Sequence, residues 1–237
     1  MVETHVTNTP PGRKGRAKAL LWMVVRIAVA LLVAYDVAQW VWRASGSNAF
    51  ELALDQNGVK VFTMKARGND LLVIKGVTRV RSTMAGLVAF FLNACEEYGG
   101  CANDRTLLVV DRQLQYGAFE QAMGFPFRPR EMGVRTDIHQ DPRTGKLWIE
   151  YSAVPEMIPP SNFVRVTHMT DSIVLTPAGN GFIEVEYLLN MDMGGFLPNL
   201  FFNLQTPRTV YDMLRRMQPQ VNNAKYQRLK DEFIVEK

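Results

Sequence analysis

Few residues of this 237-residue chain have the types and spacing that catalysis or metal binding requires. Its three histidines, His5, His139 and His168, are widely separated, and no carboxylate–histidine group has the spacing of a metal site. The chain has no phosphate-binding glycine loop, no Gly-x-Ser-x-Gly nucleophile motif and no His-Glu-x-x-His motif. The sequence therefore predicts no metal, no cofactor and no recognisable catalytic machinery.

The two cysteines, Cys95 and Cys101, are the next residues whose chemistry could matter. They lie in Cys-Glu-Glu-Tyr-Gly-Gly-Cys, which lacks the Cys-x-x-Cys spacing of a redox or zinc pair. In an oxidising compartment they could form a disulfide that closes a small loop after a helix end, because Gly99 and Gly100 let the backbone turn. Two free thiols fit the sequence equally well.

Arg165 and His168 lie in a stretch whose pattern predicts a strand, where a polar side chain could meet the hydroxyl or headgroup of a ligand. A lone charged residue in a sheet is more often paired structurally, and Glu120 or Glu131 could pair with Arg165. If Glu120, Arg165, His168 and Tyr187 instead converged in one pocket, they would be candidate groups of an enzyme.

The segment Pro155–Asn162 joins two predicted strands and contains three prolines around Met157 and Ile158. Apolar side chains at the tip of a stiff surface loop suit a lid over a cavity or a contact with a membrane. The alternative is a loop that folds down onto the sheet.

The net charge of +4 lies entirely in the N-terminal segment. Residues 1–43 carry six basic and two acidic side chains, so the rest of the chain is neutral. A nucleic-acid-binding domain needs an excess of basic residues to neutralise phosphates. We therefore expect no nucleic-acid partner.

An apolar run follows a basic tail at the N-terminus. Residues 1–18 are polar and basic, and residues 19–43 are largely apolar, with Trp22 and Trp40 placed about 27 Å apart along a helix. This distance matches the hydrocarbon thickness of a bilayer, and tryptophans favour its interfaces, so the sequence predicts a membrane-spanning anchor. A cleavable signal peptide is the alternative, but no good small-x-small cleavage site follows the run.

The positive-inside rule places the basic tail in the cytoplasm. The main domain would then lie in the periplasm of a bacterium, anchored to the inner membrane, or would be secreted there after signal cleavage. We assign residues 47–218 to that domain and residues 219–237 to a helical C-terminal extension.

The sequence pattern of the domain predicts mainly strands. Ser47 is expected to cap a short helix over Phe50–Leu54. We expect strands at Val59–Thr63, Leu71–Val80, Leu107–Val110, Leu114–Phe119, Gly133–His139, Leu147–Ala153, Phe163–Leu175 and Phe182–Met193. Short turns between them force antiparallel neighbours. Helices are expected from Thr83 to about Cys95 and over Pro198–Met217.

Several motifs resemble the START (StAR-related lipid transfer) family, in particular its bacterial, membrane-anchored members. The motifs are Gly58-Val-Lys-Val-Phe62, Ile74-Lys-Gly-Val-Thr78, Phe163-Val-Arg-Val-Thr-His168, Val174-Leu-Thr-Pro177 and Tyr187-Leu-Leu-Asn-Met-Asp-Met-Gly-Gly-Phe-Leu-Pro198, followed by a helix ending in Leu214-Arg-Arg216. Their order and spacing cover nearly all of Phe50–Met217. The chain departs from the family at Arg130-Glu-Met132, where Arg-Asp-Phe is usual, and at Cys95–Cys101.

The resemblance implies an α+β helix-grip fold, in which a curved antiparallel sheet wraps around a long C-terminal helix and one lipid-sized cavity. The implied ligand-binding residues are Val134, Thr136, Ile149, Tyr151, Arg165, His168, Val185, Tyr187, Leu189 and Leu204. The implied gate consists of Met157, Ile158, Phe196, Leu197, Leu200 and Phe201.

The expected function is to bind one lipid in this cavity and to transfer or present it at a membrane without catalysis. A cyclase or hydrolase on the same scaffold and a lipid-responsive sensor are the alternatives, since a fold does not fix a function. Sterol, phospholipid and fatty acid all fit an apolar cavity, and no protein partner is predicted.

Overall fold

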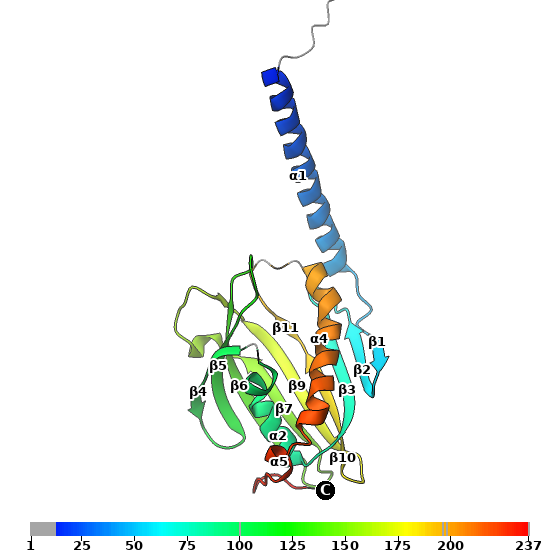
Figure 1. Ribbon diagram of the computed structural model, residues 1–237, viewed down its shortest axis with the longest axis vertical. Coiled ribbons are helices and arrows are strands. Elements are labelled where there is room, and N and C mark those ends of the chain that lie inside the picture. The colour runs from blue at the N-terminus through cyan, green and yellow to red at the C-terminus, as the bar shows by residue number, and fades with distance from the viewer. Residues whose placement is uncertain (1–12, 100, 196, 198, 237) are drawn as a thin grey trace, which may run out of the picture. The chain divides into compact units, whose positions relative to one another are not determined.

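The first part of the chain is a single long helix. The computed structural model describes residues 13–99, 101–195, 197 and 199–236, without the side chains of residues 13–17 and 201, and the chain divides into two units between Ser45 and Gly46. Helix α1 (Arg13–Ala44) is the described part of the first unit (Figure 1). Lys18–Ala44 is long and apolar enough to cross a membrane, although a signal sequence would pass the same test.

Helix α1 begins at Arg13, six residues before the predicted start. Residues 13–18 are therefore helical, and the arginine, lysine and alanine residues among them favour helix. Residues 1–12 lie outside the described part of the chain.

The second unit, Gly46–Lys237, is built on one large sheet. Its strands are β1 (Phe50–Gln56), β2 (Val59–Met64), β3 (Val73–Arg81), β4 (Cys101–Val109), β5 (Leu114–Gln121), β6 (Arg130–Gln140), β7 (Leu147–Ala153), β8 (Val164–Arg165), β9 (His168–Pro177), β10 (Phe182–Leu189) and β11 (Met191–Asp192). The order is β1-β2-β3-β10-β9-β7-β6-β5-β4, with β11 paired to β9 and β8 to β6. All pairs are antiparallel except β6 with β8.

The helices of this unit are α2 (Met84–Leu92), α3 (Ala94–Tyr98), the 3-10 turn η1 (Pro155–Met157), α4 (Asn199–Gln220) and α5 (Ala224–Gln227). Helix α4 packs across β1, β2 and β3. The predicted antiparallel sheet and long C-terminal helix are confirmed, and Figure 1 shows α4 in orange lying over the sheet.

The expected helix over Phe50–Leu54 is wrong, because these residues form strand β1. Asn57 (φ 50°) and Gly58 (φ 73°) both have positive φ and make a tight turn that pairs β1 with β2 from Gln56–Val59 outward. A turn with two positive φ angles matches the twist of an antiparallel hairpin, so the turn imposes the strand. The side chain of Ser47 accepts only a long hydrogen bond from Ala49 N, at 3.4 Å.

The predicted C-terminal extension is part of the second unit. Of residues 219–237, Pro219 and Gln220 end α4, and the further described helix is the short α5. Val221, Tyr226 and Ile234 are buried in the core, which explains why this segment does not extend outward. The Glu236 carboxylate accepts hydrogen bonds from Met84 N and Ala85 N at the start of α2.

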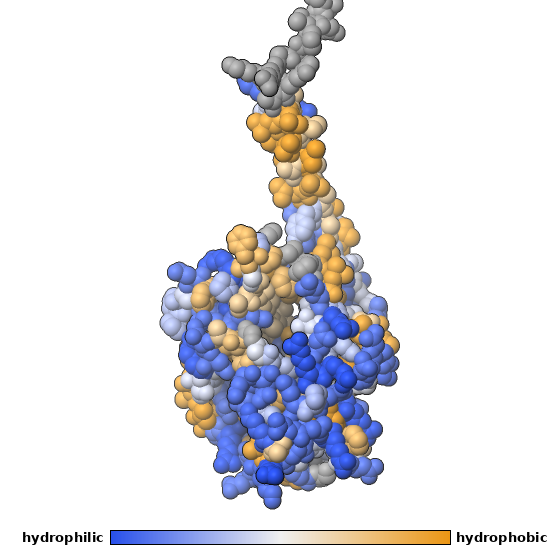
Figure 2. Space-filling view, viewed as in Figure 1, coloured by the Kyte–Doolittle hydropathy of each residue, from blue (hydrophilic) through white to orange (hydrophobic). Residues whose placement is uncertain are grey.

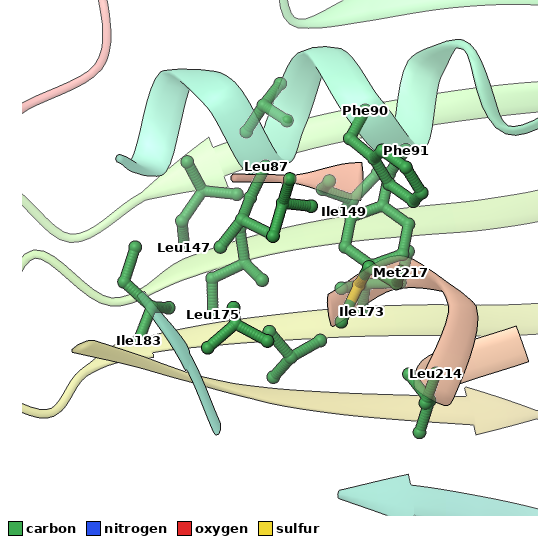
Figure 3. Close-up of a cluster of buried hydrophobic side chains, with 14 of the residues drawn as sticks. Leu87, Phe90, Phe91, Leu147, Ile149, Ile173, Leu175, Ile183, Leu214 and Met217 are labelled. Carbon is green, nitrogen blue, oxygen red and sulfur yellow. The ribbon is translucent and has the colours of Figure 1, made fainter. Parts of the chain in front are cut away.

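The main core lies between the sheet and the two helices α2 and α4. Figure 3 shows Leu87, Phe90 and Phe91 of α2 facing the side chains of the central strands, with Leu214 and Met217 of α4 nearby. Leu87, Leu147, Ile149, Leu175 and Leu214 are fully buried. Helix α4 approaches β3 so closely that a Cβ added at Gly76 would lie 2.5 Å from Leu214 Cδ1. This end of the sheet is therefore packed solid.

Candidate functional site

A cavity of about 490 Å³ lies on the same inner face of the sheet, beyond the packed core. The central strands contribute alternate residues to its wall, as expected for side chains that share one face. The contributing residues are Met132, Val134 and Thr136 of β6, Tyr151 of β7, Met169, Asp171 and Ile173 of β9, and Tyr187 of β10. Phe91 of α2, Tyr98 of α3, Ala118 of β5 and Met213 of α4 complete the enclosure.

Asp171, Tyr187, Tyr151 and Tyr98 form a cluster of titratable side chains in this wall. Asp171 lies directly opposite Tyr151 in the register of β7 and β9. Its carboxylate accepts a hydrogen bond from Asn190 N at 2.8 Å and a longer one from Tyr187 Oη at 3.5 Å. Tyr151 Oη donates to Phe91 O at 3.4 Å. Among the described residues, the buried Tyr98 Oη has no hydrogen-bond partner.

Burial dominates the electrostatics of this cluster. It raises the pKa of the Asp171 carboxyl from its ordinary value to about 7, although the hydrogen bonds from Asn190 N and Tyr187 Oη oppose the shift. Burial also raises the pKa of Tyr187, Tyr151 and Tyr98, and each of these tyrosines feels the charge of a neighbour in or beside the cluster. The phenols are therefore neutral hydrogen-bonding groups at physiological pH.

The mouth of the cavity lies between the α2–α3 segment and strands β4 and β5. The wall residues at this side are exposed, namely Leu92, Asn93, Gly99 and Asp104–Thr106, whereas Val134, Thr136 and Asp171 at the other side are buried. Cys95 and Cys101 line the mouth and form a disulfide, the first of the two alternatives left open by the sequence. The disulfide joins α3 to the start of β4 and so restrains one rim of the mouth.

The C-terminal segment holds the other side of α3. Glu97 accepts hydrogen bonds from the side chains of Lys225, at 2.9 Å, and Tyr226. These hydrogen bonds lower the pKa of Glu97. The ring of Tyr98 packs edge-on against Phe90. The position of Tyr98 in the cavity wall thus depends on contacts from both chain segments.

The sequence-predicted ligand residues divide into two groups. Val134, Thr136, Tyr151 and Tyr187 are brought together in the cavity wall. The other apolar candidates lie elsewhere: Ile149 and Val185 are fully buried in the packed core, Leu189 packs against that core, and Leu204 is 81% exposed on α4. The START resemblance indicated residues of the inner face, but not which of them the helices cover.

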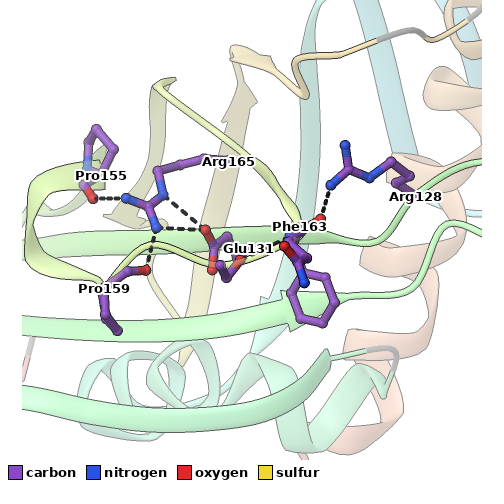
Figure 4. Close-up of polar contacts among 8 residues, drawn as sticks. Arg128, Glu131, Pro155, Pro159, Phe163 and Arg165 are labelled. Carbon is purple, nitrogen blue, oxygen red and sulfur yellow. Dashed lines mark hydrogen bonds and ion pairs between the residues drawn. The ribbon is translucent and has the colours of Figure 1, made fainter.

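Arg165 and His168 also lie outside the cavity wall. Arg165 forms an ion pair with Glu131 at 2.7 Å, one of the two partners proposed from the sequence, and it also donates to the carbonyls of Pro155 and Pro159 (Figure 4). His168 is exposed, and its Nδ1 lies 2.9 Å from Thr167 Oγ1. Arg165 therefore ties the loop before β8 to strand β6.

The described gate candidates do not line the cavity either. Ile158 and Leu197 are buried, Ile158 in a loop that folds down onto β6, while Met157 and Leu200 are partly exposed. The alternative given by the sequence, a loop packed on the sheet, describes Ile158 better. Phe196 lies outside the described residues, and the Phe201 side chain is not described.

The four candidate catalytic groups do not converge. Glu120 accepts a hydrogen bond from Asn103 at the surface, Arg165 pairs with Glu131, and His168 is exposed, so only Tyr187 faces the cavity. Among the residues that the structure describes, no group of three or more His, Cys, Asp or Glu side chains could hold a metal ion.

Sequence reasoning missed Asp171 and Tyr98. Asp171 shares the inward phase of β9 with Met169, Ile173 and Leu175, and an ionisable residue in an apolar file is a signal that was available. Tyr98 gave no such signal, because its place in the wall depends on the fold of the α2–α3 segment.

The amino-acid sequence was compared with family models and with known proteins. No family model matches the chain. An uncharacterised protein of Pseudomonas aeruginosa is 24% identical over 190 residues, which are 78% of this chain and 89% of that protein.

Solved structures are similar over most of the chain. A STAR-related lipid transfer protein of Xanthomonas axonopodis superposes with a TM-score of 0.67 at 20% identity, covering 73% of this chain and 99% of that chain. The lipid transfer and protein localization domain of human StarD13 superposes with a TM-score of 0.64 at 14% identity, covering 86% of this chain and 97% of that chain. Human StAR-related lipid transfer protein 5 superposes with a TM-score of 0.62 at 14% identity, covering 83% of this chain and 97% of that chain. The chain therefore contains the fold of the START-related lipid transfer domains.

Proposed function

We propose that the second unit binds one lipid in its cavity and transfers or presents it at a membrane. The observation that carries this proposal is the cavity of about 490 Å³ within a START fold, with Phe91, Met132, Val134 and Ile173 among its wall residues. Its volume lies within the range of small-molecule sites. The proteins with the same fold are lipid transfer proteins by name.

Energetics favour exchange at a membrane. Each methylene contributes about 0.8 kcal/mol on burial, so a chain of twelve carbons would cost about 10 kcal/mol to release into water. Local opening of a loop costs only a few kcal/mol. A protein held close to a bilayer can load and unload without that release.

Helix α1 would supply the membrane attachment. Its large apolar side chains are exposed, and Figure 2 shows hydrophobic colour along this helix, whereas the visible face of the second unit is largely hydrophilic. We propose that α1 is an uncleaved anchor with its basic end in the cytoplasm, so that the second unit lies in the periplasm.

Lipid content tests the main proposal. The full chain would be purified in nanodiscs, extracted with solvent and analysed by mass spectrometry. The Ala118→Phe variant fills the cavity, since Ala118 is buried in its wall, and should lose the bound lipid at unchanged nanodisc lipid content. Ala102→Phe makes the same change at an exposed position of β4 outside the wall and should keep it.

Equal lipid content in both variants and in the wild type would contradict the proposal. Val134→Phe offers a second cavity-filling change if Ala118→Phe does not fold, and circular dichroism would establish folding. The anchor is tested separately by alkaline extraction of membranes and by sequencing the mature N-terminus. Release of the protein into the soluble fraction, or a new N-terminus after the apolar run, would show cleavage instead.

A further inference from the structure

The cluster of Asp171, Tyr187, Tyr151 and Tyr98 is more polar than packing requires. The same strands carry Leu147, Ile149 and Leu175 at the packed end of this face, all fully buried. Burying polar groups costs free energy unless they are hydrogen-bonded, so a polar cluster beside an apolar core needs a partner.

The hydrogen-bonding capacity of the cluster is only partly used. One carboxylate oxygen of Asp171 accepts from Asn190 N at 2.8 Å, while the other has the longer contact with Tyr187 Oη at 3.5 Å. Tyr98 Oη has no partner among the described residues, and it can donate and accept. A ligand group that both accepts from a phenol and donates to a carboxyl oxygen would satisfy both sites.

The charges around the cluster restrict the ligand further. The titratable groups of the cluster around Asp171 are phenols. Tyr151 lies opposite Asp171 in the register of β7 and β9, Tyr187 Oη contacts its carboxylate, and Tyr98 interacts electrostatically with Tyr151 and Tyr187. The other charged side chains in the described wall are Asp104 and Arg105, both exposed on β4 at the mouth. A phosphate or carboxylate at the inner end would therefore be buried next to an acid without a described cation. An ammonium group would require the ionised carboxylate, which burial disfavours.

We infer that Asp171, Tyr98, Tyr151 and Tyr187 form a subsite that holds one uncharged hydroxyl group at the inner end of an apolar ligand. The ligand class is thus a lipid alcohol whose apolar body fills the rest of the cavity. The inference rests on the proposed function, because it specifies which end of the lipid enters first.

The test uses four photoreactive probes with the same twelve-carbon chain and a diazirine, ending in an alcohol, a methyl ether, a carboxylate or an ammonium group. The full chain in nanodiscs is irradiated with each probe, and peptide mass spectrometry locates the labels. The ammonium probe is compared with the alcohol at pH 6, where the Asp171 carboxyl is mostly uncharged, and the carboxylate probe at pH 8, where the probe itself is ionised. The measured quantity is the probe concentration that gives half-maximal labelling of the cavity peptides. It is expressed relative to the probe content of the nanodiscs. The alcohol should label at a concentration about fivefold lower than the ether, which loses one of the two neutral hydrogen bonds of about 1 kcal/mol each. It should label at a concentration at least about tenfold lower than the two charged probes, which fit neither hydrogen bond without a buried charge.

Tyr98→Phe removes one hydroxyl while keeping the ring contact with Phe90. It should therefore raise the alcohol concentration needed for half-maximal labelling severalfold, toward the value for the ether. Asp171→Asn provides a second variant at the other side of the subsite. Tyr211→Phe is the matched control, because Tyr211 is a buried tyrosine of α4 whose hydroxyl accepts from Asn57 outside the cavity. It should leave alcohol labelling unchanged.

The outcomes separate the two proposals. If no probe labels the cavity of the folded wild type, lipid binding itself is wrong. If the probes label the cavity but the carboxylate or ammonium probe matches the alcohol, or if Tyr98→Phe and Tyr211→Phe have equal effects, the hydroxyl subsite is wrong and lipid binding stands.

Discussion

The two ends of the central strands show how one face of a sheet can become either a core or a cavity. On β9, Leu175 is fully buried under α2 and α4, whereas Asp171, two inward positions away, lines the cavity. On β7, Leu147 and Ile149 pack and Tyr151 lines the cavity. Alternation is the same along each strand, so the difference lies in how closely the helices pack against each part of the face: α2 and α4 fill the space over Leu147 and Leu175, and they border a cavity over Asp171.

The largest expected difference in the free energy of unfolding is between two leucine substitutions in α4. Leu214 is fully buried against the packed end of the sheet, while Leu204 on the same helix is 81% exposed. Leu214→Ala should lower the free energy of unfolding by about 3–5 kcal/mol, because it leaves a cavity in a dense core. Leu204→Ala should change it by less than about 0.5 kcal/mol. Urea unfolding followed by near-ultraviolet circular dichroism measures both, and similar losses would mean that α4 does not pack as described.

Asp171 in the cavity wall should make the free energy of unfolding depend on pH. The folded-state pKa of Asp171 is raised to about 7, above its unfolded value, so the folded protein binds this proton more tightly. The associated stability is present at pH 5 and is lost as the pH rises through 7, a change of about 2–3 kcal/mol between pH 5 and pH 8. Asp171→Asn should flatten this part of the pH profile. A profile of the same slope in the variant would place the titrating group elsewhere.

The disulfide should matter at the mouth and not in the core. Replacing Cys95 and Cys101 together by serine removes the link between α3 and β4 and should lower the free energy of unfolding by about 2 kcal/mol through loop entropy. Because both residues line the mouth, amide hydrogen exchange should accelerate over Ala94–Tyr98 and the start of β4. Unchanged exchange at these positions would show that Glu97 and the C-terminal segment hold α3 without the disulfide.

Two glycines provide the smallest and most direct comparison. A Cβ at Gly76 would meet Leu214 and Val210 of α4 at 2.5 and 2.8 Å, whereas at Gly117 in the cavity wall the first contact is Arg105 O at 3.5 Å. Gly76→Ala should therefore cost about 1–2 kcal/mol, since leucine and valine must shift, and Gly117→Ala less than about 0.5 kcal/mol. Comparable melting temperatures for the two variants would remove the distinction between the packed and open ends.

The elements of the sheet were largely predictable. The strand Leu147–Ala153 is confirmed at both ends, and the predicted strands from Val59 to Phe119 appear in order with shifted boundaries. The failure at Phe50–Leu54 has a specific cause, because the turn at Asn57 and Gly58 imposes a hairpin over a short segment whose apolar spacing also fits a helix.

The sequence by itself determined the contrast between an apolar N-terminal helix and a neutral domain, and the antiparallel sheet. These features follow from composition and from a period of two residues along each strand. Val134, Tyr151 and Tyr187 were indicated as cavity residues by the START resemblance. Only the tertiary structure decided which inward residues pack and which surround a cavity, because that depends on where α2, α3 and α4 cross the sheet. It also placed Tyr98 in the same cavity wall as Asp171, and it paired Arg165 with Glu131.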